Sequence, residues 1–287
     1  LECVAFLCAD RCVGAARRIP IATAFFVELP DGFRYLVTAR HVVERELGQI
    51  QVRLNTRSGS FQFEPAPHER WERSHEADVA ALPFSRKPEP RTDLAYRVIP
   101  YECFVDARCC YTGPGLTDEL RAEGGIPVHL GDDMYSFSLF TARVGEQRNL
   151  PVVRFGHISG LPAEPIKVDH EFEVVGYVAE LLSWAGHSGS PVFWASGTQV
   201  ARGKLRNGSE AIAVGRVKGL LGLLSAHFDI PTVPERTRGV GATEEPEDSL
   251  EPIRIKLNAG LAVITPAEEI RRLLMREDVV ERREGLK

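Results

Sequence analysis

The residues best suited to chemistry form one short run, Gly186-His187-Ser188-Gly189-Ser190-Pro191. A serine hydroxyl becomes a nucleophile when it stands on a tight turn, beside a base and near backbone amides that stabilise a negative oxygen. The glycines on either side of Ser188 allow the turn conformations and the close backbone approach that such a site requires. We therefore expect Ser188 at the tip of a turn, with the backbone amides of Gly186 and Ser188 facing the same side.

Two earlier segments supply a base and a carboxylate. His41 lies within Leu36-Val37-Thr38-Ala39-Arg40-His41-Val42-Val43, and Asp78 opens the apolar run Asp78-Val79-Ala80-Ala81-Leu82. Together with the nucleophile run, these segments resemble, in residues and in order, the trypsin-like serine peptidases, including their bacterial and HtrA-like relatives. Two more segments are similar to the family's substrate-pairing strand and to the strand that opens its second barrel: Gly222-Leu223-Leu224-Ser225-Ala226-His227 and Cys110-Tyr111-Thr112-Gly113-Pro114-Gly115. The resemblance covers most of the chain, from about residue 22 to 264.

The resemblance implies a defined role for each of these residues. His41 is the general base toward Ser188, and Asp78 orients the imidazole and stabilises the imidazolium. The amides of Gly186 and Ser188 form the oxyanion hole. The implied reaction is hydrolysis of a peptide bond in a protein or peptide substrate, through an acyl-enzyme on Ser188, with neither a metal nor an organic cofactor.

The implied fold is all-β, with two six-stranded antiparallel β-barrels and a C-terminal α-helix. We expect residues 1–287 to form a single peptidase domain: an N-terminal barrel at 14–100, a C-terminal barrel at 101–265 and a helix at 266–287. The His and the Asp would then belong to the first barrel and the Ser to the second. The triad would lie in the cleft between the two barrels.

The sequence pattern itself favours strands. Short runs rich in β-branched and aromatic residues recur between turn residues, at 23–29, 34–38, 78–84, 109–112, 152–155, 171–177, 211–214, 219–225 and 260–264. Turn residues at 29–33 predict an antiparallel hairpin between the first two runs. Thr265 as N-cap and Pro266 as first helical residue predict the start of an amphipathic helix packed on the body of the protein. Residues 55–76 and 235–252 are expected to be exposed loops.

By the same resemblance, five residues belong to the substrate-binding region: Leu182, Ser183, Ser225, His227 and Gly260. Leu182 stands at the base of the family's specificity pocket, where no acidic side chain would attract Lys or Arg. We therefore expect a small or medium apolar residue on the amino side of the cleaved bond (P1). His227 at the pocket entrance leaves open a preference for an acidic P1 side chain, and Ser225 matches the Ser that supports the catalytic Asp.

Two features depart from the pancreatic-type members of the family. His187 stands where those enzymes place an Asp that captures a newly cut N-terminus, and Arg18-Ile19-Pro20-Ile21 differs from their activation sequence. Activation by that insertion is therefore not expected. A partner protein or ligand that rearranges the oxyanion loop is the regulation that we would expect instead.

Two other functions remain open. A trypsin-like module without activity could keep the barrels and bind its target without cleaving it. An esterase of the α/β-hydrolase type would place Gly-x-Ser-x-Gly between a strand and a helix. Ser190 replaces the last glycine of that motif, and residues 191–194 are expected to be extended.

The composition limits the classes of partner that we expect for this chain. With 35 Lys and Arg against 40 Asp and Glu, and no basic run interleaved with aromatic residues, we do not expect a nucleic-acid partner. No run approaches the roughly 20 apolar residues that would cross a bilayer, so no membrane partner is expected.

The cysteines and histidines indicate whether disulfide bonds or a metal site are expected. The six cysteines, at 3, 8, 12, 103, 109 and 110, do not resemble a disulfide framework and are expected to be reduced thiols. The histidines at 68, 75, 129, 157 and 170 are scattered and predict no metal site. Because residues 1–10 resemble no secretory signal, a cytoplasmic bacterial protein is the expectation.

Overall fold

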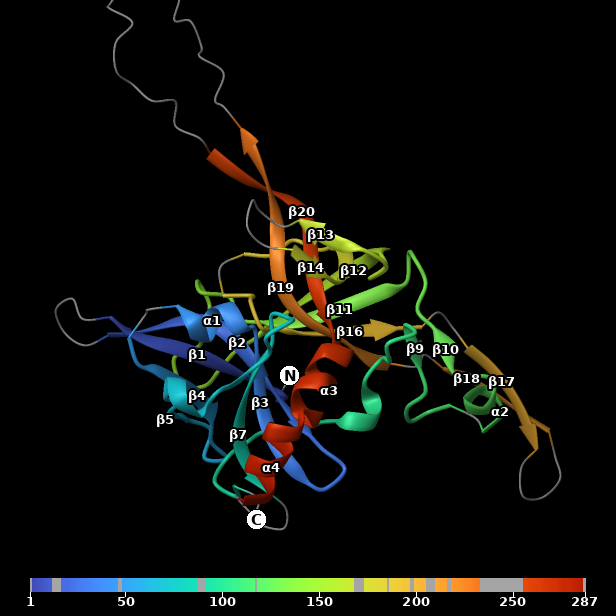
Figure 1. Cartoon of the computed structure of the whole chain (residues 1–287), viewed down its shortest axis with the longest axis horizontal. Coiled ribbons are helices and arrows are strands. Elements are labelled where there is room, and N and C mark those ends of the chain that lie inside the picture. Colours follow the sequence, from blue (N-terminus) through green and yellow to red (C-terminus); the bar gives the residue numbers. More distant parts are fainter. Residues whose placement is uncertain are drawn as a thin grey trace, which may run out of the picture.

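The computed structural model describes residues 2–11, 17–45, 48–86, 91–116, 118–167, 173–184, 186–196, 199–204, 210–215, 218–232 and 255–285. The all-β class is confirmed, because strands dominate these residues and form two units with separate cores (Figure 1). Each of the runs predicted from the sequence overlaps a strand.

The first unit is an eight-stranded sheet. Its strands are β1 (Val4–Arg11), β2 (Arg17–Glu28), β3 (Phe33–Thr38), β4 (Ile50–Asn55), β5 (Phe61–Pro65), β6 (Glu72–Arg73), β7 (Ala80–Arg86) and β8 (Ile99–Pro100). They follow the order β5-β4-β1-β2-β3-β7-β6, with β8 parallel to β2. The predicted hairpin is confirmed in the antiparallel pair β2–β3. Pairing among the described residues does not close this sheet into a six-stranded barrel.

The second unit is the predicted six-stranded antiparallel barrel, and it is closed. Its order is β11 (Asp133–Ser138), β12 (Val152–Gly160), β15 (Tyr177–Glu180), β20 (Ile255–Pro266), β19 (Lys218–Thr232) and β16 (Pro191–Ala195). Alternate side chains of β11 are buried, as a strand with one face toward the core requires. Three two-stranded sheets lie outside the barrel: β9–β10 (Cys110–Tyr111, Ile126–Pro127), β13–β14 (Pro165–Lys167, Glu173–Val175) and β17–β18 (Gln199–Lys204, Glu210–Gly215).

Two details of the strand arrangement go beyond the prediction. The apolar run near the N-terminus forms β1, which pairs with both β2 and β4. The segment 110–115 was expected to open the second barrel, which is wrong. It contributes β9 to a small sheet with β10, and β11 opens the barrel.

The C-terminal helix is confirmed, but it is broken into α3 (Ala267–Met275) and α4 (Glu277–Gly285). Pro266 is the N-cap rather than the first helical residue, because the hydroxyl of Thr265 pairs with Ser225 and caps nothing. Apolar residues of both helices join the core of the first sheet, as predicted for packing on the body: Ile270, Leu273, Leu274 and Val279. Figure 1 shows the two helices beside β3 and β7.

Residues 55–76 are not one irregular loop, since they contain β5 paired with β4, a short 3-10 helix (His68–Arg70) and β6 paired with β7. Cys3, Cys8, Cys103, Cys109 and Cys110 are free thiols. Cys12, His170 and the predicted loop 235–252 lie outside the described residues.

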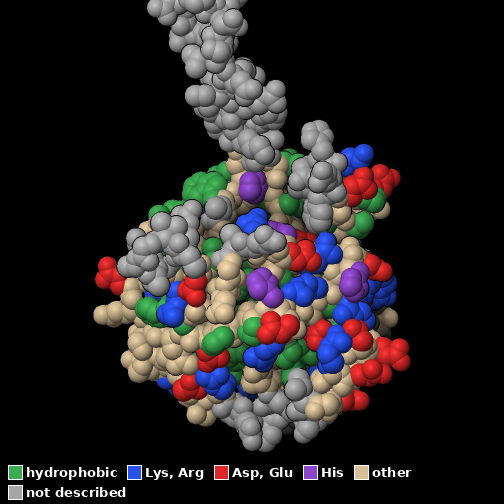
Figure 2. Space-filling view, turned by 60° about the vertical axis from the view of Figure 1, so that its left-hand side comes forward, with side chains coloured by type: hydrophobic (Ala, Val, Ile, Leu, Met, Phe, Trp, Pro, Cys, Tyr) green, Lys and Arg blue, Asp and Glu red, His purple; other side chains and the backbone are tan. Residues whose placement is uncertain are grey.

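In the part of the chain that the structure describes, neither the charge pattern on the surface nor the helices mark a single class of partner. Acidic and basic side chains are interspersed over the face drawn in Figure 2. Among the helices that the structure describes, none has the length and apolar character needed to span a bilayer.

Candidate active site

His41 and Asp78 meet because two strands pair. His41 lies in α1 (Arg40–Glu44) just after β3, and Asp78 lies just before β7. The antiparallel register pairs Thr38 with Ala80, so the end of one strand lies beside the start of the other. The carboxylate of Asp78 accepts two hydrogen bonds from His41, one from the backbone N–H and one from Nδ1, each at 2.8 Å.

This pair has the geometry of an oriented general base. Asp78 is 1% exposed, whereas 29% of the His41 side chain is exposed. A carboxylate at Nδ1 holds the hydrogen on that nitrogen, so Nε2 remains as the basic nitrogen. The imidazole is thus anchored on its buried side and open on the other.

The run around Ser188 forms the predicted turn. Gly186 and Gly189 have φ values of 98° and 78°, in the left-handed region that favours glycine. The Ser190 N–H donates to the His187 carbonyl at 3.0 Å, and the Gly189 N–H donates to the Leu224 carbonyl on β19 at 2.8 Å. Ser188 therefore lies on a turn closed by its own backbone and attached to the second barrel.

The turn of Ser188 also packs against the first sheet, at the residues just before His41. A Cβ on Gly189 would lie 2.1 Å from the Thr38 hydroxyl and 3.0 Å from the amide of Ala39. The Ser188 carbonyl accepts a hydrogen bond from the Thr23 N–H at 3.0 Å. Glycine at 189 thus allows Ser188 to sit against the segment that leads into the helix of His41.

The Ser188 hydroxyl makes no hydrogen bond to His41 within the described part of the chain. Catalytic hydrogen bonds are often long in an enzyme without substrate and tighten in the substrate complex. Of the turn amides, those of His187, Gly189 and Ser190 donate backbone hydrogen bonds. In the described residues the amides of Gly186 and Ser188, the predicted oxyanion donors, donate none.

His187 is packed inside the turn. It is 1% exposed, its Nδ1 accepts the Trp184 N–H at 3.1 Å, and its ring stacks on the Trp184 indole. Burial, with the nearby Arg154 guanidinium and the electrostatic effect of His227, lowers the pKa of His187 to about 4. Nε2 has no hydrogen-bond partner among the described residues. A neutral imidazole thus occupies the position next to Ser188.

Two of the predicted substrate-binding residues line one cavity. Leu182, 49% exposed, and Gly260 share a cavity of about 850 Å³ with Val153 and the 78% exposed Phe155. Asn258, which was not predicted from the sequence, connects Gly260 to Ser183. The Asn258 side chain donates to the Ser183 carbonyl at 2.5 Å and accepts the Gly260 N–H at 2.7 Å.

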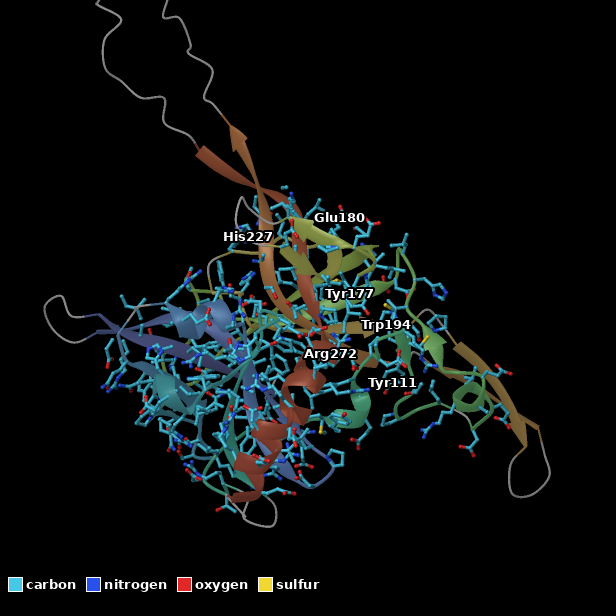
Figure 3. The ribbon with its side chains drawn as sticks, in the orientation of Figure 1. Tyr111, Tyr177, Glu180, Trp194, His227 and Arg272 are labelled. Carbon is cyan, nitrogen blue, oxygen red and sulfur yellow. The ribbon has the colours of Figure 1, made fainter. Side chains whose placement is uncertain are left out.

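The other two predicted residues lie on β19. The Ser225 hydroxyl is buried and shares a hydrogen bond of 2.5 Å with Thr265 on β20. His227 is partly exposed, on the part of β19 that leads out of the barrel toward the projecting β19–β20 hairpin (Figure 3). Neither residue lines the cavity of Leu182 and Gly260.

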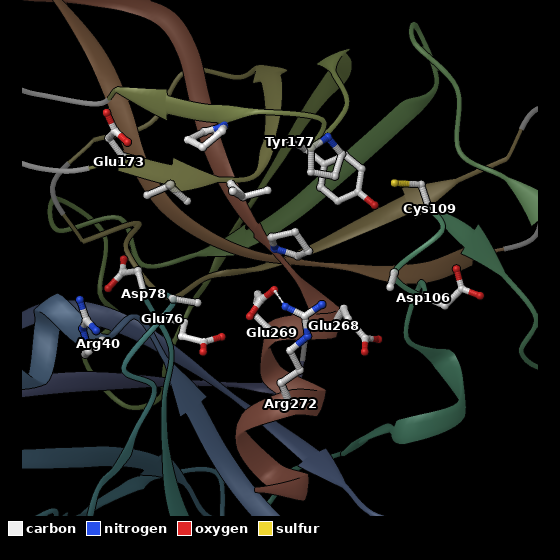
Figure 4. Close-up of a pocket in the computed structure, with 17 residues that line it drawn as sticks. Arg40, Glu76, Asp78, Asp106, Cys109, Glu173, Tyr177, Glu268, Glu269 and Arg272 are labelled. Carbon is white, nitrogen blue, oxygen red and sulfur yellow. Dashed lines mark hydrogen bonds and ion pairs between the residues drawn. The ribbon is translucent and has the colours of Figure 1, made fainter.

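A second cavity, of about 480 Å³, lies where α3 meets both units (Figure 4). Asp78 and Arg40 line it from the first unit, and Tyr177 lines it from the barrel. Glu269 and Arg272 of α3 form an ion pair of 2.8 Å at its wall. The pair of His41 and Asp78 is therefore flanked by a charged cavity that was not predicted from the sequence.

No family model matches the sequence, and no curated protein matches it. Similar solved structures include the HtrA-type protease AlgW with a decapeptide, 15% identical with a TM-score of 0.48 over 98% of this chain and 65% of that chain. Deg5 is 14% identical, with a TM-score of 0.42 over 79% and 80% of the chains. Rv3671c of M. tuberculosis, a serine-to-alanine mutant in an inactive form, is 14% identical, with a TM-score of 0.44 over 98% and 88%. This chain thus spans 65% of the length of the AlgW chain.

Proposed function

We propose that this chain is a serine endopeptidase with His41, Asp78 and Ser188 as its triad. The observation that carries the proposal is the buried Asp78 carboxylate, which holds the Nδ1 side of His41 at 2.8 Å while the other side of the ring stays open. The turn of Ser188 packs on the residues just before His41. The strand after the turn, β16, does not fit the strand–turn–helix elbow of an α/β-hydrolase esterase.

In the proposed reaction, Ser188 Oγ attacks the carbonyl carbon of the peptide bond while His41 Nε2 takes its proton. The amides of Gly186 and Ser188 stabilise the resulting oxyanion. His41 then passes the proton to the leaving amine, which leaves an acyl-enzyme on Ser188. Water attacks this ester with His41 again as base, which releases the acid and restores the hydroxyl.

Labelling with a fluorophosphonate tests the proposal directly. The probe phosphonylates a serine oxygen and loses fluoride, so a functional nucleophile is expected to give close to one label per chain. Ser188→Ala should abolish the label. Ser190→Ala, which removes a neighbouring buried hydroxyl, should retain it. An inert wild-type protein would favour the binding module without activity.

We also propose a small or medium apolar P1 preference. Its support is Leu182, in a cavity whose exposed side chains include apolar Val153 and Phe155. Peptides that differ only in P1, with Ala, Val, Leu, Glu or Arg, should show the highest kcat/KM for an apolar residue, by at least about tenfold over Arg. A Glu preference would assign His227 to the pocket, and an Arg preference would overturn the assignment of Leu182.

A further inference from the structure

The Thr23 side chain is fully buried on β2 and belongs to neither the triad nor the predicted substrate region. Its hydroxyl donates to the Gly186 carbonyl at 2.9 Å and accepts the Leu139 N–H at 2.8 Å. Its backbone N–H donates to the Ser188 carbonyl, and its carbonyl accepts from the Thr38 hydroxyl at 2.8 Å. One residue of the first sheet thus bonds to both ends of the oxyanion turn.

These bonds act on two peptide groups that adjoin the proposed oxyanion donors. The Gly186–His187 peptide is held at its oxygen by the Thr23 hydroxyl and at its N–H by the Trp184 carbonyl. The peptide after Ser188 is held at its oxygen by the Thr23 N–H and at its N–H by the Leu224 carbonyl. A peptide group is planar, so fixing these two groups restricts how the amides of Gly186 and Ser188 can rotate.

The Thr23 hydroxyl also binds a second segment that packs against the turn, the residues just after β11. A Cβ on Gly186 would lie 3.2 Å from Leu139 and 3.3 Å from Thr141, so the segment after β11 packs directly beneath this glycine. Through its bond to the Leu139 amide, Thr23 ties this segment to the first sheet. Because both hydrogen bonds of the Thr23 hydroxyl are buried, loss of the hydroxyl would leave a buried carbonyl and a buried N–H unpaired.

We propose that Thr23 is a positioning residue for the oxyanion hole, holding the Gly186–His187 peptide so that the amides of Gly186 and Ser188 face one point. The inference rests on the proposed peptidase function. Thr23 is fully buried and does not contact the substrate. Its hydroxyl should therefore affect stabilisation of the transition state and not the binding of substrate. Its removal should therefore change kcat with little change in KM.

The test compares Thr23→Val, which keeps the shape but not the hydroxyl, with Thr23→Ser, which keeps the hydroxyl. We expect Thr23→Val to lower kcat about 10- to 100-fold, less than loss of a direct oxyanion donor, with KM within about threefold. A peptide boronic acid, whose tetrahedral adduct with Ser188 places an oxygen in the oxyanion hole, should lose affinity in parallel. Thr23→Ser should restore both values to within about threefold of wild type.

Ser136→Ala removes a buried hydroxyl elsewhere in the second barrel and is expected to leave kcat unchanged. Unchanged kcat in a folded Thr23→Val protein would overturn the inference while the peptidase function stood. If Thr23→Val does not fold, Thr23→Ser provides the test. A loss of kcat above tenfold in this variant, which retains the hydroxyl, would contradict the inference. An inert wild-type enzyme would instead contradict the peptidase function.

Discussion

Replacing Asp78 by Asn is expected to lower kcat by about 10⁴ while the protein stays folded. Both carboxylate oxygens of Asp78 accept hydrogen bonds from His41. An Asn that keeps its oxygen on the backbone N–H of His41 must turn its NH₂ group toward Nδ1. The imidazole then carries its hydrogen on Nε2, which can no longer accept the proton of Ser188.

The measurement is steady-state hydrolysis of the best peptide, with thermal unfolding as a check of the fold. Glu76→Gln is the matched control, because Glu76 lines the same cavity as Asp78 yet is exposed and two residues away. It should leave kcat within about threefold. In nitrogen NMR spectra the His41 hydrogen should move from Nδ1 to Nε2 in Asp78→Asn. A loss of kcat below tenfold would remove Asp78 from the triad.

Acidification should destabilise the protein through His187. The pKa of this imidazole is about 4 in the folded protein and near 6.5 when unfolded, so the unfolded chain binds a proton more readily. Above pH 6.5 the neutral ring contributes its full amount to the free energy of unfolding, and this contribution decreases as the pH falls toward 4. The pKa difference corresponds to about 3 kcal/mol of unfolding free energy, all of it lost below pH 4.

Denaturant unfolding at a series of pH values would measure this loss. His187→Asn is the comparison, because Asn does not titrate and its side-chain oxygen can accept the Trp184 N–H. The wild type should lose about 3 kcal/mol more than His187→Asn between pH 7 and pH 4. Equal slopes for the two proteins would show that His187 titrates alike in the folded and unfolded states. Because the ring stays neutral down to about pH 4, its Nδ1 should continue to accept the Trp184 N–H at pH 5.5.

Local chemistry made much of the fold predictable. Runs rich in β-branched and aromatic residues mark strands because such side chains pack well on a pleated surface, and turn residues at 29–33 mark a hairpin because few residues adopt its backbone angles. The N-terminal run Val4–Arg11 was missed as a strand, since continuous apolar residues carry no period of two. The helix start was misplaced because Thr265 bonds to a distant strand, a contact that propensity does not encode.

The sequence by itself determined which residue types could do chemistry here: a serine between glycines, a histidine and an aspartate ahead of it, and no acidic residue at Leu182. Tertiary structure alone decided how they meet. Strand pairing brings Asp78 to His41, Thr23 of one sheet holds the turn of the other unit, and His187 becomes a buried neutral ring. The physical reason is that residue type sets the chemical capacity of a side chain, whereas distance, burial and hydrogen-bond partners arise only when segments far apart in the chain pack together.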